Sequence, residues 1–315
     1  MNSLIEQASR RLEQLRQAGA SVPDLPTPPS EPVPAVETAA TVPAAPAISA
    51  ATASESAKPQ RGAVVSRQVD LDLDALVSAG LVSPNAPRSQ IADEYRVIKR
   101  PLIANAMGKG AEPIANGNLI MVTSALAGEG KSFTALNLAM SIATELDNTV
   151  MLVDADVARP SLLRMLGLPA GPGLLDLLVD PQVELSKVLL RTNIDKFSIL
   201  PSGTPHVRAT ELLASDAMME LVKDIARRYS DRIVIFDSPP LLLTTESRVL
   251  ATHMGQIVLV VQADKTLQRD VQGALATIEA CPVKMMVLNQ AGAGLRDGYG
   301  YGQGYGYGYG YGSAT

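Results

Sequence analysis

The sequence predicts an α/β fold built on a doubly wound, mainly parallel sheet. Short apolar runs without polar alternation recur through the core, as expected for strands that are buried on both faces. Segments with helical spacing separate these runs, and such alternation produces parallel sheets. A glycine-rich turn follows one run and aspartates follow two others, so polar groups are expected to collect at the carboxyl ends of the strands.

The elements follow one another in a regular order along the chain. Strands are expected at residues 118–123, 149–153, 197–200, 232–236, 256–262 and 284–288, and helices at 132–145, 210–228 and 266–280. Upstream, residues 68–86 regain apolar periodicity and are expected to pack on the core. Residues 90–100 have a helical pattern that we expect to end at Pro101, because proline has no backbone N–H to donate.

Both ends of the chain differ from this core in composition. Residues 1–20 predict a short amphipathic helix, because Leu4, Leu12 and other apolar residues repeat at helical spacing. Such a helix either docks on a partner or is a solvated terminal helix without a role. Residues 21–66 are rich in proline and alanine, which is typical of a disordered linker. Residues 67–296 are expected to form a single globular domain, and residues 297–315 a disordered tail.

Composition limits the classes of function. The chain has 315 residues, a net charge of −5 and a pI of about 5.2, so nothing suggests a nucleic-acid partner. A single cysteine, Cys281, fits a reducing compartment. The sequence shows neither a signal peptide nor an apolar stretch of about 20 residues. We therefore expect a cytoplasmic protein that reaches the inner face of the plasma membrane only through a partner.

The glycine-rich turn matches a phosphate-binding loop. Residues 125–132 read ALAGEGKS, which fits the P-loop pattern except that Ala125 replaces the first glycine. Gly128 and Gly130 let backbone N–H groups converge on phosphate oxygens, and the following helix directs its positive end toward them. Lys131 is expected to reach the β- and γ-phosphates of ATP, and Ser132 to bind Mg²⁺.

Two acidic motifs follow other strands. Asp154 and Asp156, in VDADVARP, are spaced so that both can face the crevice at the strand end, where one carboxylate can accept a proton and the other can bind a metal. Helix capping explains one of these aspartates but not both. Asp237, in IVIFDSPP, follows four apolar residues, as the Mg²⁺-binding aspartate of a Walker B strand does.

The tail carries six of the eight tyrosines of the chain, separated mostly by glycine. A flexible segment of this kind cannot bury a core, because glycine adds no apolar surface and loses the most entropy on ordering. Attached to a nucleotide site, a cluster of phenol groups indicates an enzyme that phosphorylates its own tail or, as we expect within an oligomer, the tail of a neighbouring subunit. The expected acceptors are Tyr299, Tyr301, Tyr305, Tyr307, Tyr309 and Tyr311.

Together, the AGEGKS, VDADVARP and FDSPP motifs and the tyrosine cluster resemble the bacterial tyrosine kinases (BY-kinases). The resemblance covers residues 90–315 and is most specific to the exosortase-associated autokinases of exopolysaccharide loci. It implies catalytic roles for Lys131, Asp154, Asp156, Arg159 and Asp237, with Asp154 as the base. It further implies Mg²⁺ ligation by Ser132, Asp156 and Asp237, and ATP binding by Ala127, Gly128, Glu129, Gly130, Lys131, Ser132, Phe133 and Asn289.

The resemblance also implies partners. The ring-forming motif of the family, E-x-x-R-x-x-R, corresponds here to Asp93, Arg96 and Lys99, which predicts a homo-oligomer, although lysine lacks the bidentate geometry of arginine. A solvated helix face is the alternative for these three residues. Further expected partners are a membrane-bound chain-length determinant that activates the kinase, and a cognate tyrosine phosphatase.

Two other functions fit parts of the sequence. A partition- or septum-type ATPase switch would share this core, but such proteins have a second lysine early in the loop, where this chain has Leu126. A non-catalytic scaffold would explain the Tyr/Gly tail as a low-complexity segment. The intact loop lysine and the three aspartates argue against the scaffold.

Overall fold

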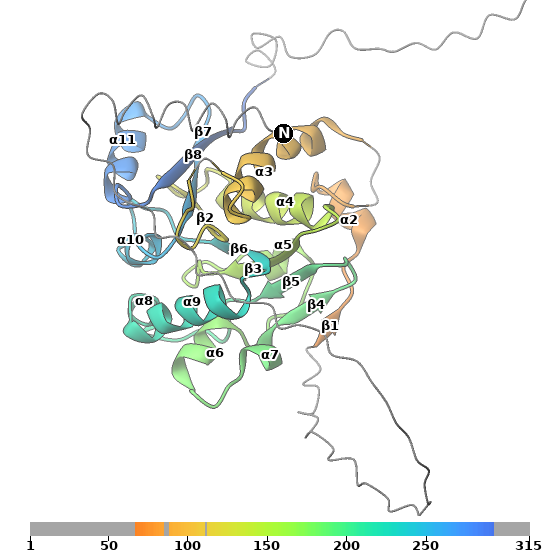
Figure 1. The fold of residues 1–315 in the computed structure, drawn as a ribbon, viewed down its shortest axis with the longest axis vertical. Coiled ribbons are helices and arrows are strands. Elements are labelled where there is room, and N and C mark those ends of the chain that lie inside the picture. The colour runs from red at the N-terminus through yellow and green to blue at the C-terminus, as the bar shows by residue number, and fades with distance from the viewer. Residues whose placement is uncertain (1–66, 85–87, 111, 293–315) are drawn as a thin grey trace, which may run out of the picture. The chain divides into compact units, whose positions relative to one another are not determined.

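The computed structural model describes residues 67–84, 88–110 and 112–292. The helix expected at residues 1–20, the linker and all six tail tyrosines lie outside the described residues. The described part forms one eight-stranded sheet covered by helices on both faces (Figure 1). The α/β architecture predicted from the sequence is therefore confirmed.

The strands follow the order β1-β4-β5-β3-β6-β2-β7-β8 across the sheet. All neighbouring strands are parallel except β4 and β5, which pair antiparallel. The strands are β1 (Gln68–Val69), β2 (Leu119–Ser124), β3 (Thr149–Asp154), β4 (Leu190–Thr192), β5 (Phe197–Leu200), β6 (Arg232–Asp237), β7 (Gln256–Gln262) and β8 (Val283–Asn289). The sequence predicted six of these strands; it missed β1 and β4, which are too short to show a pattern.

Helices cover each face of the sheet with its own apolar cluster. One face is covered by α2 (Leu73–Ser78), α3 (Gln90–Ala106), α4 (Lys131–Ala143) and α5 (Leu162–Met165). The other face is covered by α6 (Leu174–Val179), α7 (Leu185–Val188), α8 (Ala209–Leu213), α9 (Asp216–Arg228), α10 (Glu246–Ala251) and α11 (Gln268–Thr277). The central strands are buried on both sides, which explains why their sequences are continuously apolar.

The segment before α3 packs on the core, as its periodicity indicated. Leu71, Leu76, Leu81 and Val82 are buried against the α4 face of the sheet. The backbone N–H of Val82 also donates to the Asn137 side chain of α4 at 2.6 Å.

Two helix boundaries differ from those expected. Helix α3 continues through Pro101 to Ala106. The carbonyl that loses its partner to Pro101 belongs to Val97, which is 74% exposed, so water can satisfy it and the interruption costs little. The single helix expected at 210–228 is two helices, because the hydroxyl of Ser215 caps α9 by accepting from the N–H of Met218.

Candidate active site

The glycine-rich loop joins β2 to α4, as expected. Gly128 and Gly130 have φ angles of 87° and 92°, a region that favours glycine because it has no Cβ. Ala127 and Gly128 are exposed at the crest of the loop, and α4 begins at Lys131. Backbone N–H groups and the positive end of a 13-residue helix therefore meet at an accessible edge of the sheet, which suits a bound phosphate.

Glu129 stabilises the phosphate loop through hydrogen bonds of its buried side chain. Its side chain is buried, and its carboxylate accepts from the backbone N–H of Leu126 at 2.6 Å and from the Thr266 hydroxyl. The loop is thereby tied to the segment that follows β7. From the sequence, Glu129 was expected only to contact ATP, because its partner Thr266 lies 137 residues further along the chain.

Asn289 also contacts this loop. Its side-chain nitrogen donates to the carbonyl of Glu129 at 2.9 Å, and the neighbouring Gln290 donates to the carbonyl of Gly128 at 3.3 Å. The structure thus places Asn289 against the loop backbone, at the carboxyl end of β8. Phe133, the other expected nucleotide contact after the loop, lines a groove between α3 and β8 and packs against the core.

The acidic motifs come together beside the loop. Strand β6 lies between β3 and β2, and Asp154 and Asp237 are direct partners in the β3–β6 pairing. Asp237 also pairs with Val122 of β2, the strand that leads into the loop. Asp154 and Asp237 are 1% and 0% exposed, so two carboxyl groups are buried side by side where the phosphate loop begins.

Burial strongly affects both carboxyl groups. Desolvation raises the pKa of Asp154 to about 7, and the charge of Asp156 adds a smaller upward shift. The hydrogen bond that Asp154 accepts from the N–H of Leu162 lowers the pKa and offsets part of this rise. Desolvation and the charge of Asp154 raise the pKa of Asp237 to about 8, although Lys131 and the nearby Ser132 hydroxyl act in the opposite direction. A carboxyl group with a pKa near neutrality can exchange a proton at physiological pH.

Several oxygens of the pair lack hydrogen-bond partners among the described residues. They are Oδ1 of Asp154 and both carboxylate oxygens of Asp237. Ser132 lies near enough to lower the pKa of Asp237 but does not complete a hydrogen bond to it. Buried polar atoms are normally paired, so unpaired ones at this position point to a ligand.

Lys131 and Asp156 form an ion pair across the site. Their Nζ and Oδ2 atoms are 2.8 Å apart, and the side chains are 14% and 4% exposed. Asp156 additionally accepts from the backbone N–H of Arg159 at 3.2 Å. The Arg159 side chain itself is exposed and forms no ion pair with any described residue, so the structure brings only its backbone to the carboxylates.

No group of three or more His, Cys, Asp or Glu side chains is arranged to hold a metal ion within residues 67–292 as far as they are described. The expected Mg²⁺ set contains only two carboxylates, Asp156 and Asp237, with the hydroxyl of Ser132. Asp237 and Ser132 fit such a site, because neither Asp237 oxygen has a hydrogen-bond partner in the described part of the chain. Asp156 is held by Lys131 instead.

The three residues expected to support oligomerisation differ in position. Asp93 and Arg96 lie on the exposed face of α3 and pair with each other. Lys99 is 2% exposed; its Nζ lies 2.6 Å from a carboxylate oxygen of Glu145 and donates to the carbonyl of Ser141. Lys99 therefore holds α3 against the end of α4 in its own chain, which differs from the surface role expected for it.

A further acidic residue that the sequence did not single out shapes the neighbouring loops. The carboxylate of Asp176 accepts from the backbone N–H groups of Gly173 at 2.7 Å and Thr204 at 3.0 Å. Partial burial tends to raise the pKa of Asp176, but these hydrogen bonds stabilise its charged form more, so the pKa is lowered. Asp176 thereby joins the loop before α6 to the loop after β5, and both loops lie near Asp154.

Comparison with protein families identifies the class of protein to which this fold and site belong. The ParA model, described as the NUBPL iron-transfer P-loop NTPase, matches residues 116–289, which is more than half of the chain. The chain therefore belongs to the ParA family of P-loop NTPases. The matched segment runs from just before β2 to the end of β8 and contains the loop and all three aspartates.

Most of the similar curated proteins are named bacterial tyrosine kinases, as the motifs indicated. The chain is 28% identical over 206 residues to the tyrosine-protein kinase YwqD of Bacillus subtilis (strain 168), covering 65% of this chain and 83% of YwqD. It is 34% identical over 196 residues to the succinoglycan biosynthesis transport protein ExoP of Rhizobium meliloti (strain 1021), covering 61% of this chain and 23% of ExoP. Among solved structures, the kinase domain of VpsO matches with a TM-score of 0.54 and 26% identity, covering 64% of this chain and 96% of that domain.

The relatives differ in length. The chain spans most of YwqD but less than a quarter of ExoP and of several related tyrosine kinases. None of the helices within the described ranges is long and apolar enough to cross a bilayer.

Proposed function

We propose that this protein is an ATP-dependent protein-tyrosine autokinase that phosphorylates the tyrosines of its own C-terminal tail. The observation that carries the proposal is the buried carboxyl pair Asp154 and Asp237, aligned on adjacent strands beside a phosphate loop. The pair can supply both a metal ligand and a base, and phosphoryl transfer to a phenol needs both. The similarity to YwqD and to the VpsO kinase domain supports the same activity.

The loop and its neighbours would bind ATP. Backbone N–H groups at Gly128 and Gly130 and the start of α4 would hold the phosphates. Lys131 is already desolvated beside Asp156 and would move its charge to the β- and γ-phosphates. Mg²⁺, bound by Asp237 and Ser132 and, once Lys131 has left it, by Asp156, would neutralise charge on the phosphates.

Asp154 would act as the base. The phenol of an incoming tyrosine gives its proton to Asp154 while its oxygen forms the new bond to the γ-phosphorus. The bond between that phosphorus and the β–γ bridging oxygen breaks, and ADP leaves with the electron pair. Phenol has a pKa of about 10 and is weakly nucleophilic at neutral pH, so a positioned base is needed.

We propose that transfer occurs between subunits of a homo-oligomer. Strand β8 is at the edge of the sheet, and its Met286 and Leu288 side chains are 59% and 56% exposed. A cavity of about 1040 Å³ lies between β8 and α3, next to the exposed Val97. An apolar edge strand of this kind favours association with another chain.

Reach alone allows a tail to enter its own site as well. Tyr299 is seven positions after Gly292, a stretch that spans about 24 Å when fully extended. Strand β3 is four strands from β8, or about 19 Å away across the sheet. A mixing experiment therefore decides between the two routes. A Lys131→Met chain with an intact tail is incubated with a wild-type chain that ends at Gly298, and phosphotyrosine on the Lys131→Met chain supports transfer between subunits.

The second candidate function is a nucleotide-switched ATPase, which the ParA match favours. Such switches carry a lysine where this chain has Leu126. Leu126 is half-buried, packs against the core and donates its N–H to Glu129, so it acts as part of the loop scaffold. The family description also mentions iron transfer. Iron–sulfur clusters are usually held by several cysteines, whereas this chain has one, Cys281, which is buried, so its residues do not support that activity.

We further propose a role in exopolysaccharide synthesis, chain length or export, because ExoP is named for succinoglycan biosynthesis and transport. A membrane-bound chain-length determinant would recruit the kinase to the inner face of the plasma membrane and activate it, and a tyrosine phosphatase would reverse the modification. Full phosphorylation of the tail would add roughly −9 to −12 charge and weaken subunit association by repulsion.

One assay tests the kinase proposal. Purified wild type, Lys131→Met and a chain ending at Gly298 are incubated with ATP and Mg²⁺ and probed for phosphotyrosine. We expect a signal from the wild type alone. ATP hydrolysis by the wild type without phosphotyrosine would support the switch ATPase instead, and neither activity would support a scaffold.

A further inference from the structure

A row of polar side chains crosses one face of the sheet at the amino ends of its central strands. Gln68, Arg191 and Ser198 are direct partners across β1, β4 and β5. Thr149 of β3 pairs in the same way with Arg232 of β6. All five residues line one cavity of about 340 Å³. The pairing of the strands therefore brings five polar side chains together in one hollow.

This cavity lies on the α9 face of the sheet, at the opposite edge from the phosphate loop. Met151 and Val234 belong to the buried apolar cluster of that face. Thr149 and Arg232 precede them by two positions, so their side chains point to the same face. On β3, Thr149 is five residues before Asp154, or about 17 Å away along the strand. The cavity is therefore separate from the candidate active site.

Two of the five residues are more deeply buried than the ends of strands usually are. Ser198 is 6% exposed, and its hydroxyl donates a long hydrogen bond of 3.3 Å to the carbonyl of Val150. The Nε atom of Arg232 is buried and has no hydrogen-bond partner among the described residues. The Arg232 guanidinium stacks on the ring of Tyr229, 4.5 Å from its centroid, which orients it. Buried donors are normally paired, so this one points to a ligand.

The charges around the cavity favour an anion. Its charged lining residues are Arg191, Asp195, Lys196 and Arg232. Arg191 is exposed and, within the described part of the chain, has no ion pair. The carboxylate of Asp231 is 3.7 Å from Nε of Arg232 and 70% exposed, so it neutralises that arginine only weakly. Lys196 donates to backbone carbonyls just after α4, which leaves the two arginines for a ligand.

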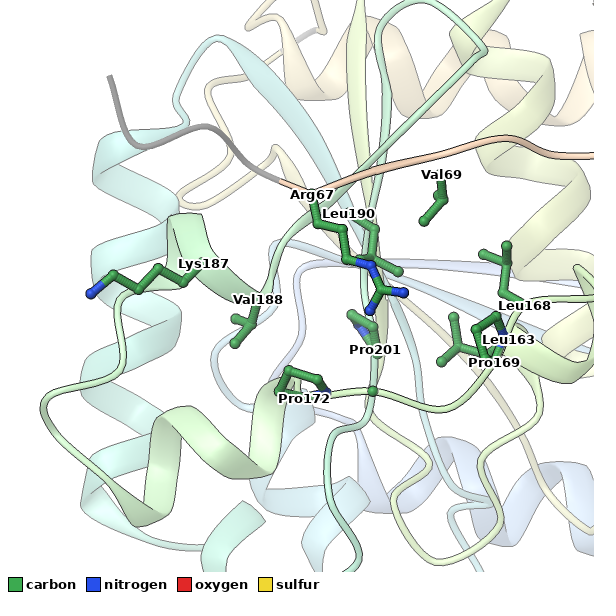
Figure 2. A pocket seen from close by; sticks show the side chains of 11 residues that line it. Arg67, Val69, Leu163, Leu168, Pro169, Pro172, Lys187, Val188, Leu190 and Pro201 are labelled. Atoms are coloured by element: carbon green, nitrogen blue, oxygen red, sulfur yellow. The ribbon is translucent and has the colours of Figure 1, made fainter. Parts of the chain in front are cut away.

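The opposite face of β1 and β4 has a much smaller cavity. Arg67 and Val69 flank Gln68 in the sequence and point the other way, into a cavity that Leu190 also lines. Figure 2 shows the Arg67 side chain extending into this cavity between Leu190 and Pro201. Its volume is about 20 Å³, which is room for about one water molecule. Of the two cavities, the one on the α9 face can therefore hold a ligand larger than water.

We propose that the cavity on the α9 face binds a phosphate ester that carries hydroxyl groups, of the phosphorylated-sugar class. The guanidinium groups of Arg191 and Arg232 bind the phosphate, because their forked donors match its oxygens. The side chains of Gln68, Thr149 and Ser198 hydrogen-bond to the hydroxyl groups, since amides and hydroxyls both donate and accept. The cavity has the usual volume of a small-molecule site.

Isothermal titration calorimetry of the full-length protein tests the site with three probes, which are glucose 1-phosphate, inorganic phosphate and glucose. Glucose 1-phosphate should bind more tightly than either of the others. Arg191→Gln should weaken its binding by about 10- to 100-fold, the loss expected for a charge-assisted hydrogen bond. Arg232→Lys keeps the charge but removes the forked donors, and should weaken binding by about 10-fold.

Two control variants locate the bound ligand. Lys131→Met alters the phosphate loop, and Arg269→Gln removes an exposed arginine of α11 that does not line the cavity. Both should bind glucose 1-phosphate like the wild type. Thermal unfolding of every variant checks that it is folded, and Arg191→Gln should keep the wild-type Tm because Arg191 is exposed.

Three results would overturn the proposal. The first is the absence of glucose 1-phosphate binding to the wild type, or binding that both arginine variants leave unchanged. The second is binding that is lost in Lys131→Met and kept in Arg191→Gln, which would place the ligand in the phosphate loop. The third is equal affinity for inorganic phosphate and glucose 1-phosphate, which would leave the hydroxyl contacts without a role. None of these results depends on kinase activity.

Discussion

Replacing Asp237 with asparagine should stabilise the nucleotide-free and Mg²⁺-free protein at pH 8 while abolishing phosphoryl transfer. Asp237 is fully buried, and neither of its oxygens has a hydrogen-bond partner among the described residues. Its folded-state pKa is raised to about 8, chiefly by burial and then by the charge of Asp154. The folded state therefore resists ionisation of this group.

The sign of the pH dependence follows from the direction of the shift. A carboxyl whose pKa is raised in the folded state stays protonated there while it ionises in the unfolded chain, so the stability of the protein falls as the pH rises from about 4 to about 8. The ion pair of Lys131 with Asp156 is retained in Asp237→Asn, so the main change is the loss of the buried charge. Asparagine cannot ionise and so avoids this penalty of about 1.4 kcal/mol per pKa unit, although its own buried amide lacks partners at a cost of about 1 to 3 kcal/mol. The expected gain is on the order of 2 kcal/mol, or about 4 to 8 °C in Tm for a domain of this size.

The assay is thermal unfolding in EDTA at pH 5 and pH 8 for wild type, Asp237→Asn and the control Asp195→Asn, which removes an exposed carboxylate. Asp237→Asn should exceed the wild type in Tm at pH 8, and this advantage should shrink at pH 5, where the wild-type carboxyl is protonated. A Tm for Asp237→Asn below that of the wild type at pH 8 would refute the conclusion that Asp237 is buried without a partner.

Three other substitutions test separate parts of the site. Asp154→Asn should lower phosphoryl transfer by about 10²- to 10⁴-fold, the usual contribution of a general base, with ATP affinity unchanged in a fluorescent-nucleotide titration; an equal loss of ATP affinity would assign Asp154 to binding instead. Glu129→Gln should weaken nucleotide binding by about 10-fold and lower stability by about 1 to 2 kcal/mol, because the carboxylate that joins Leu126 to Thr266 becomes neutral. Lys99→Met should lower the free energy of unfolding by about 1 to 3 kcal/mol in urea titrations at every protein concentration, because its ion pair with Glu145 lies within one chain; loss of oligomers at unchanged monomer stability would assign Lys99 to an interface.

The sequence predicted the elements whose signals are local. The central strands are continuously apolar because both faces are buried, and the loop glycines adopt positive φ angles that their identity allows. Asp154 and Asp237 were expected at strand ends, where a parallel sheet brings them to one edge. Their direct pairing depends on β6 lying between β3 and β2, which the sequence does not reveal.

Features that depend on distant contacts could not be predicted. Glu129 holds the loop through Thr266, and Asp176 joins two loops through Gly173 and Thr204. The contacts of Glu129 with Thr266 and of Asp176 with Thr204 join residues that are 137 and 28 positions apart in the sequence, so their proximity arises only in the folded sheet. The inward direction of Lys99 has the same origin, because its partner Glu145 belongs to the end of another helix.

The central claim is tested most directly by site-resolved mass spectrometry of the tail. Wild type and Lys131→Met are incubated with ATP and Mg²⁺, digested, and analysed for phosphate on residues 299–311. We predict phosphate on several of these tyrosines in the wild type and on none in Lys131→Met. A wild-type protein that hydrolyses ATP while its tail stays unmodified would contradict the account.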